Sequence, residues 1–167
     1  MTTAAPEKTG STEQSDAPKP LGAPQTSQAL IDEGRAKVKA TLDAHYPSSI
    51  DMGDGSYAVP YGSSSVAIVV RAYTETDTMI EIMAQVVTGG AIDAEATKWL
   101  LRKNAELHFG AFGLLFDDTI IFTYSLSGSC LDPADLKSAI NSVSIIADYY
   151  DDELIKMVGG KRVSDLG

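Results

Sequence analysis

Two segments near the middle of the chain alternate between two kinds of side chain, and they constrain the fold more than any other feature. Residues 65–75 read SVAIVVRAYTE and residues 78–89 read TMIEIMAQVVTG. Because successive side chains of a strand point to opposite faces of a sheet, each segment has one aliphatic face and one mixed face. Thr76 and Asp77, which lie at the junction, favour a turn, so the pair predicts an antiparallel hairpin. The mixed face of the second strand is predicted to carry Met79, Glu81, Met83, Gln85 and Val87.

Three helices are predicted to accompany this hairpin, over residues 27–46, 93–108 and 132–158. Each begins at a residue whose side-chain oxygen can accept a hydrogen bond from the first helical turn. These capping residues are Ser27, Asp93 and Asp132.

A second hairpin is predicted by the stretches FGLLF and TIIFTYSL, which flank Asp117 and Asp118. Residues 57–59 fit a short strand that Pro60 confines to the edge or end of a sheet. The predicted order is helix, three strands, helix, two strands, helix. This order predicts an α+β fold with a mainly antiparallel sheet of about five strands.

The composition limits the partners that such a domain can bind. The 167 residues carry a formal net charge of −10, with an isoelectric point of about 4.5. This charge disfavours nucleic acids and anionic membrane surfaces as partners. The single cysteine, Cys130, cannot form an internal disulfide, no apolar run is long enough to span a membrane, and no signal peptide is visible. We therefore expect a soluble cytoplasmic protein.

The chain divides into three parts by composition. Residues 1–26 are rich in Thr, Ser, Ala, Pro, Gln and Glu and are predicted to form a disordered N-terminal tail. Residues 27–160 are predicted to form one folded domain, and residues 161–167 a short C-terminal tail.

The stretch KNAELHFGAFGLLFDDTIIF, residues 103–122, raises the question of a reactive site with a glycine loop. Gly110 and Gly113 follow a helix, whereas glycines that cradle a phosphate precede one. Asn104 is predicted to hydrogen-bond the backbone of a neighbouring loop or strand rather than to take part in catalysis. The stretch is therefore interpreted as a helix-to-strand junction.

No other pattern indicates chemistry. The two histidines, His45 and His108, are isolated, and Cys130 has no neighbouring base in the sequence. The acidic cluster ADYYDDE, with Asp148, Asp151 and Asp152, is interpreted as a solvated helix face rather than a calcium or magnesium site. The sequence predicts no catalytic residue, no cofactor and no metal, and hence no enzyme.

Apolar side chains occur on more than one face of several predicted elements. Residues 114–116 and 120–122 are consecutive large hydrophobic residues, and residues 99–101 spread over a wide arc of the second helix. Apolar surface that stays uncovered marks a partner site or an oligomer interface. The alternative left open is that the first and third helices cover the remaining face of the sheet.

Two stretches carry a resemblance to a known family: WLLRKNAELHFGAFGLLFDD and LDPADLKSAINSVSIIADYYDDELIKMVGG. Over residues 57–160 the chain resembles YbjN-type and type III secretion chaperone-like (CesT-like) proteins, especially their actinobacterial peptide-binding branch. The resemblance implies a helix, three strands, helix, two strands, helix fold that usually pairs into a homodimer. It also implies binding of extended client segments to apolar patches, and it implies no catalytic residues.

These observations favour a non-enzymatic peptide-binding chaperone or adaptor. The alternative is a regulatory or structural homodimeric module that binds a folded partner. The residues predicted to contact a client are Met79, Met83, Val87, Leu115 and Ile121. Trp99 and Leu101 are predicted to mediate self-association.

Overall fold

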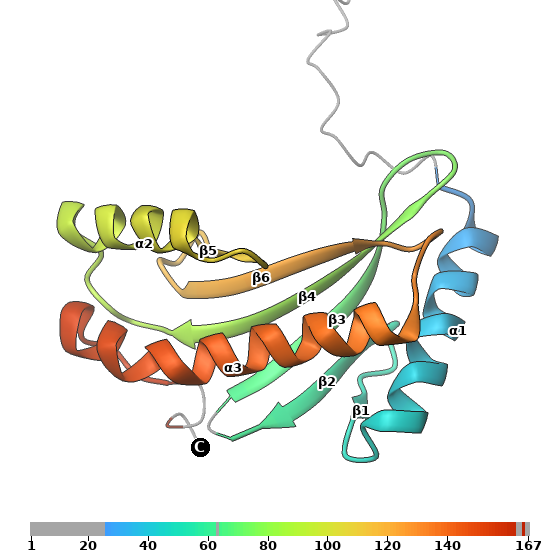
Figure 1. The fold of residues 1–167 in the computed structure, drawn as a ribbon, viewed down its shortest axis with the longest axis horizontal. Helices are drawn as coiled ribbons and strands as arrows, with labels where there is room; N and C mark the ends of the chain where they lie inside the picture. The colour runs from blue at the N-terminus through green and yellow to red at the C-terminus, as the bar shows by residue number, and fades with distance from the viewer. Residues whose placement is uncertain (1–25, 63, 163–164, 166–167) are drawn as a thin grey trace, which may run out of the picture.

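The computed structural model describes residues 26–62, 64–162 and 165 of the chain. The tail predicted for residues 1–26 lies outside the described residues, except for Thr26. The elements, in chain order, are α1 (Gln28–His45), β1 (Ile50–Asp51), β2 (Ser56–Tyr61), β3 (Ser64–Ala72), β4 (Thr78–Val87), α2 (Ala94–Glu106), β5 (Ala111–Leu114), β6 (Ile120–Ser127) and α3 (Pro133–Val158) (Figure 1).

The predicted fold class is confirmed, with one strand more than expected. The strands form a single antiparallel sheet in the order β1-β2-β3-β4-β6-β5. The additional strand is β1, whose two residues pair with Tyr57 and Ala58 of β2. The predicted order does not include it, because two residues are too few for an alternating pattern to show.

The three predicted helix caps are present. The side chain of Ser27 accepts a hydrogen bond from the amide of Leu30, and Asp93 accepts one from Ala96. Asp132 accepts a hydrogen bond from Ala134 at the start of α3. The local sequence therefore fixes where each helix begins.

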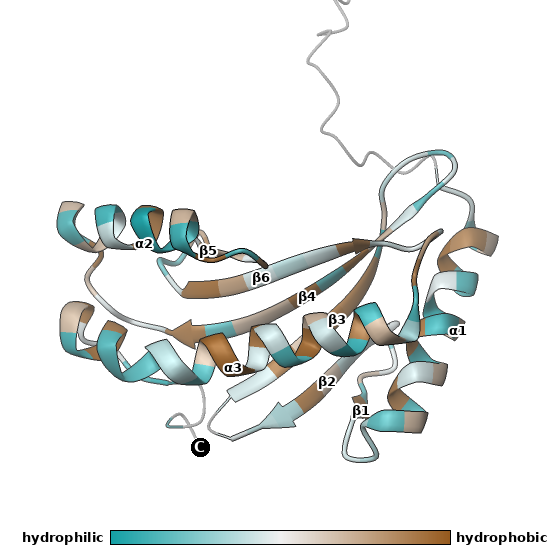
Figure 2. Cartoon of the chain, in the orientation of Figure 1, coloured by the Kyte–Doolittle hydropathy of each residue, from teal (hydrophilic) through white to brown (hydrophobic). Residues whose placement is uncertain are grey.

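All three helices lie on the same face of the sheet, and the core fills the space between the two layers. On α1, a Cβ at Gly34 would lie 3.0 Å from Val70 of β3, so the helix packs closely on that strand. α3 crosses in front of the sheet and contacts β3, β4 and β6 (Figure 1). Figure 2 shows hydrophobic stretches on β4, β6 and α3, the elements that meet in this core. Within the described residues, no helix covers the other face of the sheet.

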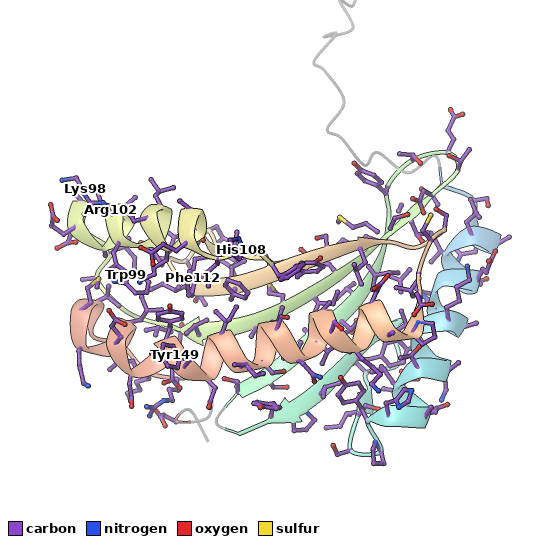
Figure 3. The ribbon with its side chains drawn as sticks, in the orientation of Figure 1. Lys98, Trp99, Arg102, His108, Phe112 and Tyr149 are labelled. Carbon is purple, nitrogen blue, oxygen red and sulfur yellow. The ribbon has the colours of Figure 1, made fainter. Side chains whose placement is uncertain are left out.

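An aromatic cluster fixes α2 beside α3. The ring of Trp99 lies 5.8 Å from that of Phe112 and 5.5 Å from that of Tyr150, measured between centroids. Phe112 in turn packs edge-on against Phe122, with centroids 4.9 Å apart. Figure 3 shows Trp99 and Phe112 in the space between α2 and α3. The cluster thus joins two helices to two strands through dispersion and edge-to-face contacts.

One predicted strand face needs a correction. The alternating pattern predicts that Val87 lies on the mixed face of β4 with Met79 and Met83. The pairing of β4 with β6 shifts register between Gln85 and Val87, and such an irregularity breaks the two-residue alternation. Val87 is therefore only 1% exposed and belongs to the core, so its predicted place on the mixed face is wrong.

The interpretation of the acidic cluster on α3 as a solvated face is wrong for Asp151. Its side chain is only 6% exposed, and its Oδ2 lies 2.7 Å from Nε of Arg162, which also contacts Asp152. Lys161 pairs with Thr88 through two backbone hydrogen bonds, which brings the chain after α3 back to the sheet. The partner of Asp151 thus comes from a chain reversal that helix periodicity does not reveal.

Candidate functional site

The side of the sheet opposite the helices is a surface that the described residues leave without a second layer. We call it the open face, and it consists of the residues that alternate with the core. These are Ala58, Ala67, Val69, Arg71, Met79, Glu81, Met83, Gln85, Ile121, Thr123, Ser125 and Ser127. Half of them are Ala, Val, Thr or Ser, so parts of the surface are low and let another chain approach the backbone closely.

Met79 and Met83 lie on the open face, as the alternating pattern predicts. Met83 has Ala67 of β3 on one side and Thr123 of β6 on the other. Both methionines are partly exposed, and the small neighbours leave the Met83 side chain free to adjust. A flexible thioether among small side chains suits contact with varied apolar groups.

A single ion pair crosses the open face among these residues. Nε of Arg71 lies 2.5 Å from Oε2 of Glu81 on the neighbouring strand. Because both groups are partly exposed, this pair adds little stability. It does cancel the local charge, so the centre of the open face is close to neutral.

The remaining predicted contact residues are placed differently. Ile121 is on the open face but only 9% exposed, and Val87 is in the core. Leu115 lies beyond the end of β5 in the turn to β6, where its amide bonds the carbonyl oxygen of Thr119. The structure therefore brings Met79, Met83 and Ile121 to one face and leaves Leu115 at the hairpin turn.

The two residues predicted for self-association differ in exposure. Leu101 is 65% exposed on α2. Trp99 is partly buried in the aromatic cluster, and its Nε1 donates a hydrogen bond of 3.2 Å to Glu153. Most of the Trp99 side chain therefore serves the contact between α2 and α3.

A second surface, which no pattern in the sequence predicts, lies between β6 and α3. A hollow of about 360 Å³ opens there, and we call it the helix-side hollow. Its lining residues are Phe109, Tyr124, Leu126, Asp135, Ser138, Ala139 and Ser142. Phe109 is 60% exposed, and its ring centroid lies 6.2 Å from that of Tyr124. A neighbouring hollow of about 310 Å³ shares Phe109 and Ser142 and extends the surface to Ile145 of α3.

Only one signal in the sequence pointed to this hollow. Phe109 belongs to the helix-to-strand junction and falls outside every alternating or helical stripe, which leaves it without a predicted place in the core. The other lining residues come from segments far apart in the chain. Their proximity is a product of the packing of α3 on the sheet.

The junction itself is structural, as predicted. The Nδ2 of Asn104 donates a 3.0 Å hydrogen bond to the carbonyl oxygen of Phe112, and its Oδ1 accepts one of 2.7 Å from the Phe112 amide. Asn104 thus occupies the outer edge of β5 in the manner of a neighbouring strand. Among the described residues, no group of three or more His, Cys, Asp and Glu side chains is placed to hold a metal ion.

The far end of β6 is held by a small network around Asp77. Ser127 donates a 2.5 Å hydrogen bond to Asp77, and the amides of Ser129 and Thr78 each donate one of 2.8 Å. Burial by itself raises the pKa of Asp77, but these hydrogen bonds outweigh it and hold the pKa below its usual value. The network therefore stabilises the fold above the ordinary pKa of an aspartate and loses this effect as the pH falls through the lowered value.

Comparison with known proteins gives a family and a fold. The family model described as "T3SS (YopN, CesT) and YbjN peptide-binding chaperone 1" (TY-Chap1) matches residues 32–166. A chain in the crystal structure of the ExsC-ExsE complex has the same fold, with a TM-score of 0.56 and 14% sequence identity. The similarity covers 75% of this chain and 95% of that chain. No curated protein sequence matches the chain, and none of the described helices is long and apolar enough to cross a membrane. Because the family match spans most of the 167 residues, the protein belongs to the T3SS and YbjN peptide-binding chaperone family.

Proposed function

We propose that the protein is a non-enzymatic chaperone or adaptor that holds an extended client segment on apolar surface of its open face. The observation that carries this proposal is the placement of all three helices on one side of the sheet. It leaves Met79 and Met83 without a covering layer within the described residues. Membership of a peptide-binding chaperone family and the fold shared with a protein crystallised in a complex both support a protein partner.

Burial of apolar area is the main source of free energy for binding a client on the open face. Complete burial of a large apolar side chain contributes about 1.5–3 kcal/mol. Met79 and Met83 are already partly buried and Ile121 is only 9% exposed, so a client that covers them gains only a fraction of this contribution from each. The client therefore has to make several contacts at once to offset the cost of ordering a segment. The net charge of −10 favours clients that carry basic residues.

Met83→Glu is expected to weaken client binding by about tenfold or more, because a carboxylate on the open face loses its hydration when an apolar segment covers it. The measurement is recovery of protein clients by affinity purification and crosslinking from the native host, followed by titration of a recovered client. Met52→Glu is the matched control, since Met52 is 60% exposed in a loop away from the open face. Equal client binding by Met83→Glu and the unsubstituted protein would count against the open face as the client site.

We further propose that α2 contributes to a homodimer through Leu101, which is 65% exposed. Leu101→Asp is expected to weaken self-association by about tenfold or more, because it places two carboxylates in an apolar contact. Analytical ultracentrifugation over a range of concentrations measures this. Glu95→Asp on the same helix is the control, since it changes no charge. A protein that sediments as a monomer throughout, with or without the substitution, would contradict the homodimer.

The exposed Leu101 also favours the alternative function, a homodimeric module that binds a folded partner. The two functions separate by competition. An excess of unfolded peptide displaces a client held as an extended segment but leaves a folded partner bound.

A further inference from the structure

The described part of the chain is held at its start by a contact with the turn between β3 and β4. The hydroxyl of Thr26 donates a 2.5 Å hydrogen bond to the carbonyl oxygen of Thr74 and accepts one of 3.0 Å from the amide of Tyr73. The 25 residues that precede Thr26 are therefore attached at this end of the sheet.

A hollow of about 210 Å³ lies next to this attachment point, and we call it the open-face hollow. Its lining residues are Tyr73, Thr78, Met79, Ser125, Leu126 and Ser127. Three of these, Met79, Ser125 and Ser127, belong to the open face. Tyr73 is 42% exposed and also bonds Thr26, so it joins the hollow to the start of the described chain. An apolar side chain in the hollow would contact the Tyr73 ring and the Met79 thioether.

The segment just before Thr26 has the composition to fill this hollow. Residues 17–25 read APKPLGAPQ, and we call them the tail segment. Leu21 is the only large aliphatic side chain among residues 2–25. The prolines at positions 18, 20 and 24 restrict φ, which lowers the entropy lost when an extended segment docks against an aromatic side chain. They also lack an N–H, which favours contact with the face of a sheet over pairing with its edge.

The length of chain between Leu21 and Thr26 permits this contact. Leu21 precedes Thr26 by five residues, so an extended chain between them reaches about 18 Å. The open-face hollow begins at Tyr73, to which Thr26 is bonded, and lies within that reach. Because the tail segment belongs to the same chain, its effective concentration at the hollow is on the order of millimolar. A leucine contact too weak to hold a free peptide therefore suffices to fill the hollow in part of the molecules.

Charge also favours the tail segment as the occupant. Lys19 is its only charged residue, whereas the whole chain carries a net charge of −10. Glu75 and Asp77 lie in the turn that holds Thr26, and Glu81 lies on the open face. A second copy of the chain brings its own negative charge to this surface, which disfavours it as the occupant.

We propose that the tail segment folds back onto the open face, with Leu21 in the open-face hollow, and so competes with a client for Met79. The tail segment is then an autoinhibitory element, because a client covers Met79 only in molecules whose hollow is empty. The apparent affinity for a client falls in proportion to the fraction of such molecules. The docking needs no client, whereas the competition rests on the proposed function.

NMR of the full chain with isotope-labelled methionine methyl groups detects the docking. Leu21→Asp is expected to move the methyl resonance of Met79, because a carboxylate does not enter an apolar contact. The methyl groups of Met52 and Met157, which are 60% and 40% exposed outside the hollow, are the references and are expected to stay in place. Thr12→Asp adds the same charge outside the tail segment and is the matched control. Neither substituted residue belongs to the described core, so both variants are expected to fold.

The competition is measured by titrating the full chain into a fluorescein-labelled peptide of alternating leucine and lysine residues. Leu21→Asp is expected to tighten binding of this peptide by about threefold or more, because the hollow is then empty in every molecule. Thr12→Asp is expected to bind it like the unsubstituted protein, which controls for attraction between the added carboxylate and the lysines.

The outcomes separate the inference from the proposed function. An unmoved Met79 resonance in Leu21→Asp overturns the docking, and equal peptide binding by Leu21→Asp and Thr12→Asp overturns the competition. Either result overturns the inference and leaves peptide binding by the open face standing. A Met79 shift that grows with protein concentration assigns the contact to the tail segment of another copy and also overturns the inference. Failure of the peptide and of every client to bind any variant overturns the competition together with the proposed function.

Discussion

Phe122→Ala is expected to lower the free energy of unfolding by about 3–5 kcal/mol. Phe122 is fully buried, and its ring packs edge-on against Phe112 at a centroid distance of 4.9 Å. Removing the ring leaves a cavity where β6, β5 and α2 meet. It also removes the ring contact that supports Phe112, which in turn packs against Trp99 of α2. The loss combines the transfer term of the deleted atoms with the cavity term.

Urea unfolding followed by circular dichroism measures this difference. An unchanged slope of the unfolding free energy against urea concentration indicates that the transition stays two-state. Phe122→Leu is the matched control and is expected to cost only about 1–2 kcal/mol, because it keeps most of the apolar volume. A Phe122→Ala protein as stable as Phe122→Leu would show that this part of the core is less tightly packed than the ring distances indicate.

Gly110→Ala is expected to destabilise the fold by about 2–4 kcal/mol, through two effects that add. Gly110 has a φ of 84°, a left-handed conformation that costs any other common residue energy. A Cβ at this position would also lie 2.7 Å from both a ring carbon of Phe122 and the carbonyl oxygen of Thr123. The backbone of the junction therefore has to move, and with it Phe109 beside the helix-side hollow.

The control for this prediction separates strain from steric contact. Gly89 has a φ of 69°, and a Cβ there would have no atom within 4 Å. Gly89→Ala is therefore expected to cost only about 1 kcal/mol, from the backbone conformation alone. Thermal unfolding of the two variants side by side gives the comparison. Equal losses would mean that the Phe122 contact adds nothing and that conformation alone requires glycine at residue 110.

The local sequence was sufficient for the identity of most elements. Helix caps act within one turn, so Ser27, Asp93 and Asp132 marked the helix starts correctly. Alternation in β3 and β4 predicted the aliphatic and mixed faces up to Gln85, because strand periodicity is a property of consecutive residues. Asn104 was predicted to bond the backbone of a neighbouring loop or strand, and it bonds that of Phe112 in β5.

Only the tertiary structure decided which face of the sheet is covered. The sequence left open whether the first and third helices cover the remaining face of the sheet. In the structure α1 packs on Val70 and α3 on β3, β4 and β6, so both lie on the same face as α2. Val87 lies in the core because the pairing of β4 with β6 is irregular at that point. Arg162 lies beside Asp151 because the chain reverses after α3. In each case the deciding contact joins residues on different elements.

Part of the candidate site could likewise be predicted from the sequence, and part depends on the tertiary structure. Met79 and Met83 could be predicted because they occupy alternate positions of one strand, and their exposure followed once the helices were placed. The helix-side hollow could not be predicted, since it depends on how α3 lies beside β6. Side-chain patterns report a residue's own neighbourhood in the chain, whereas strand pairing, register and layer packing are set by interactions between segments far apart in the sequence.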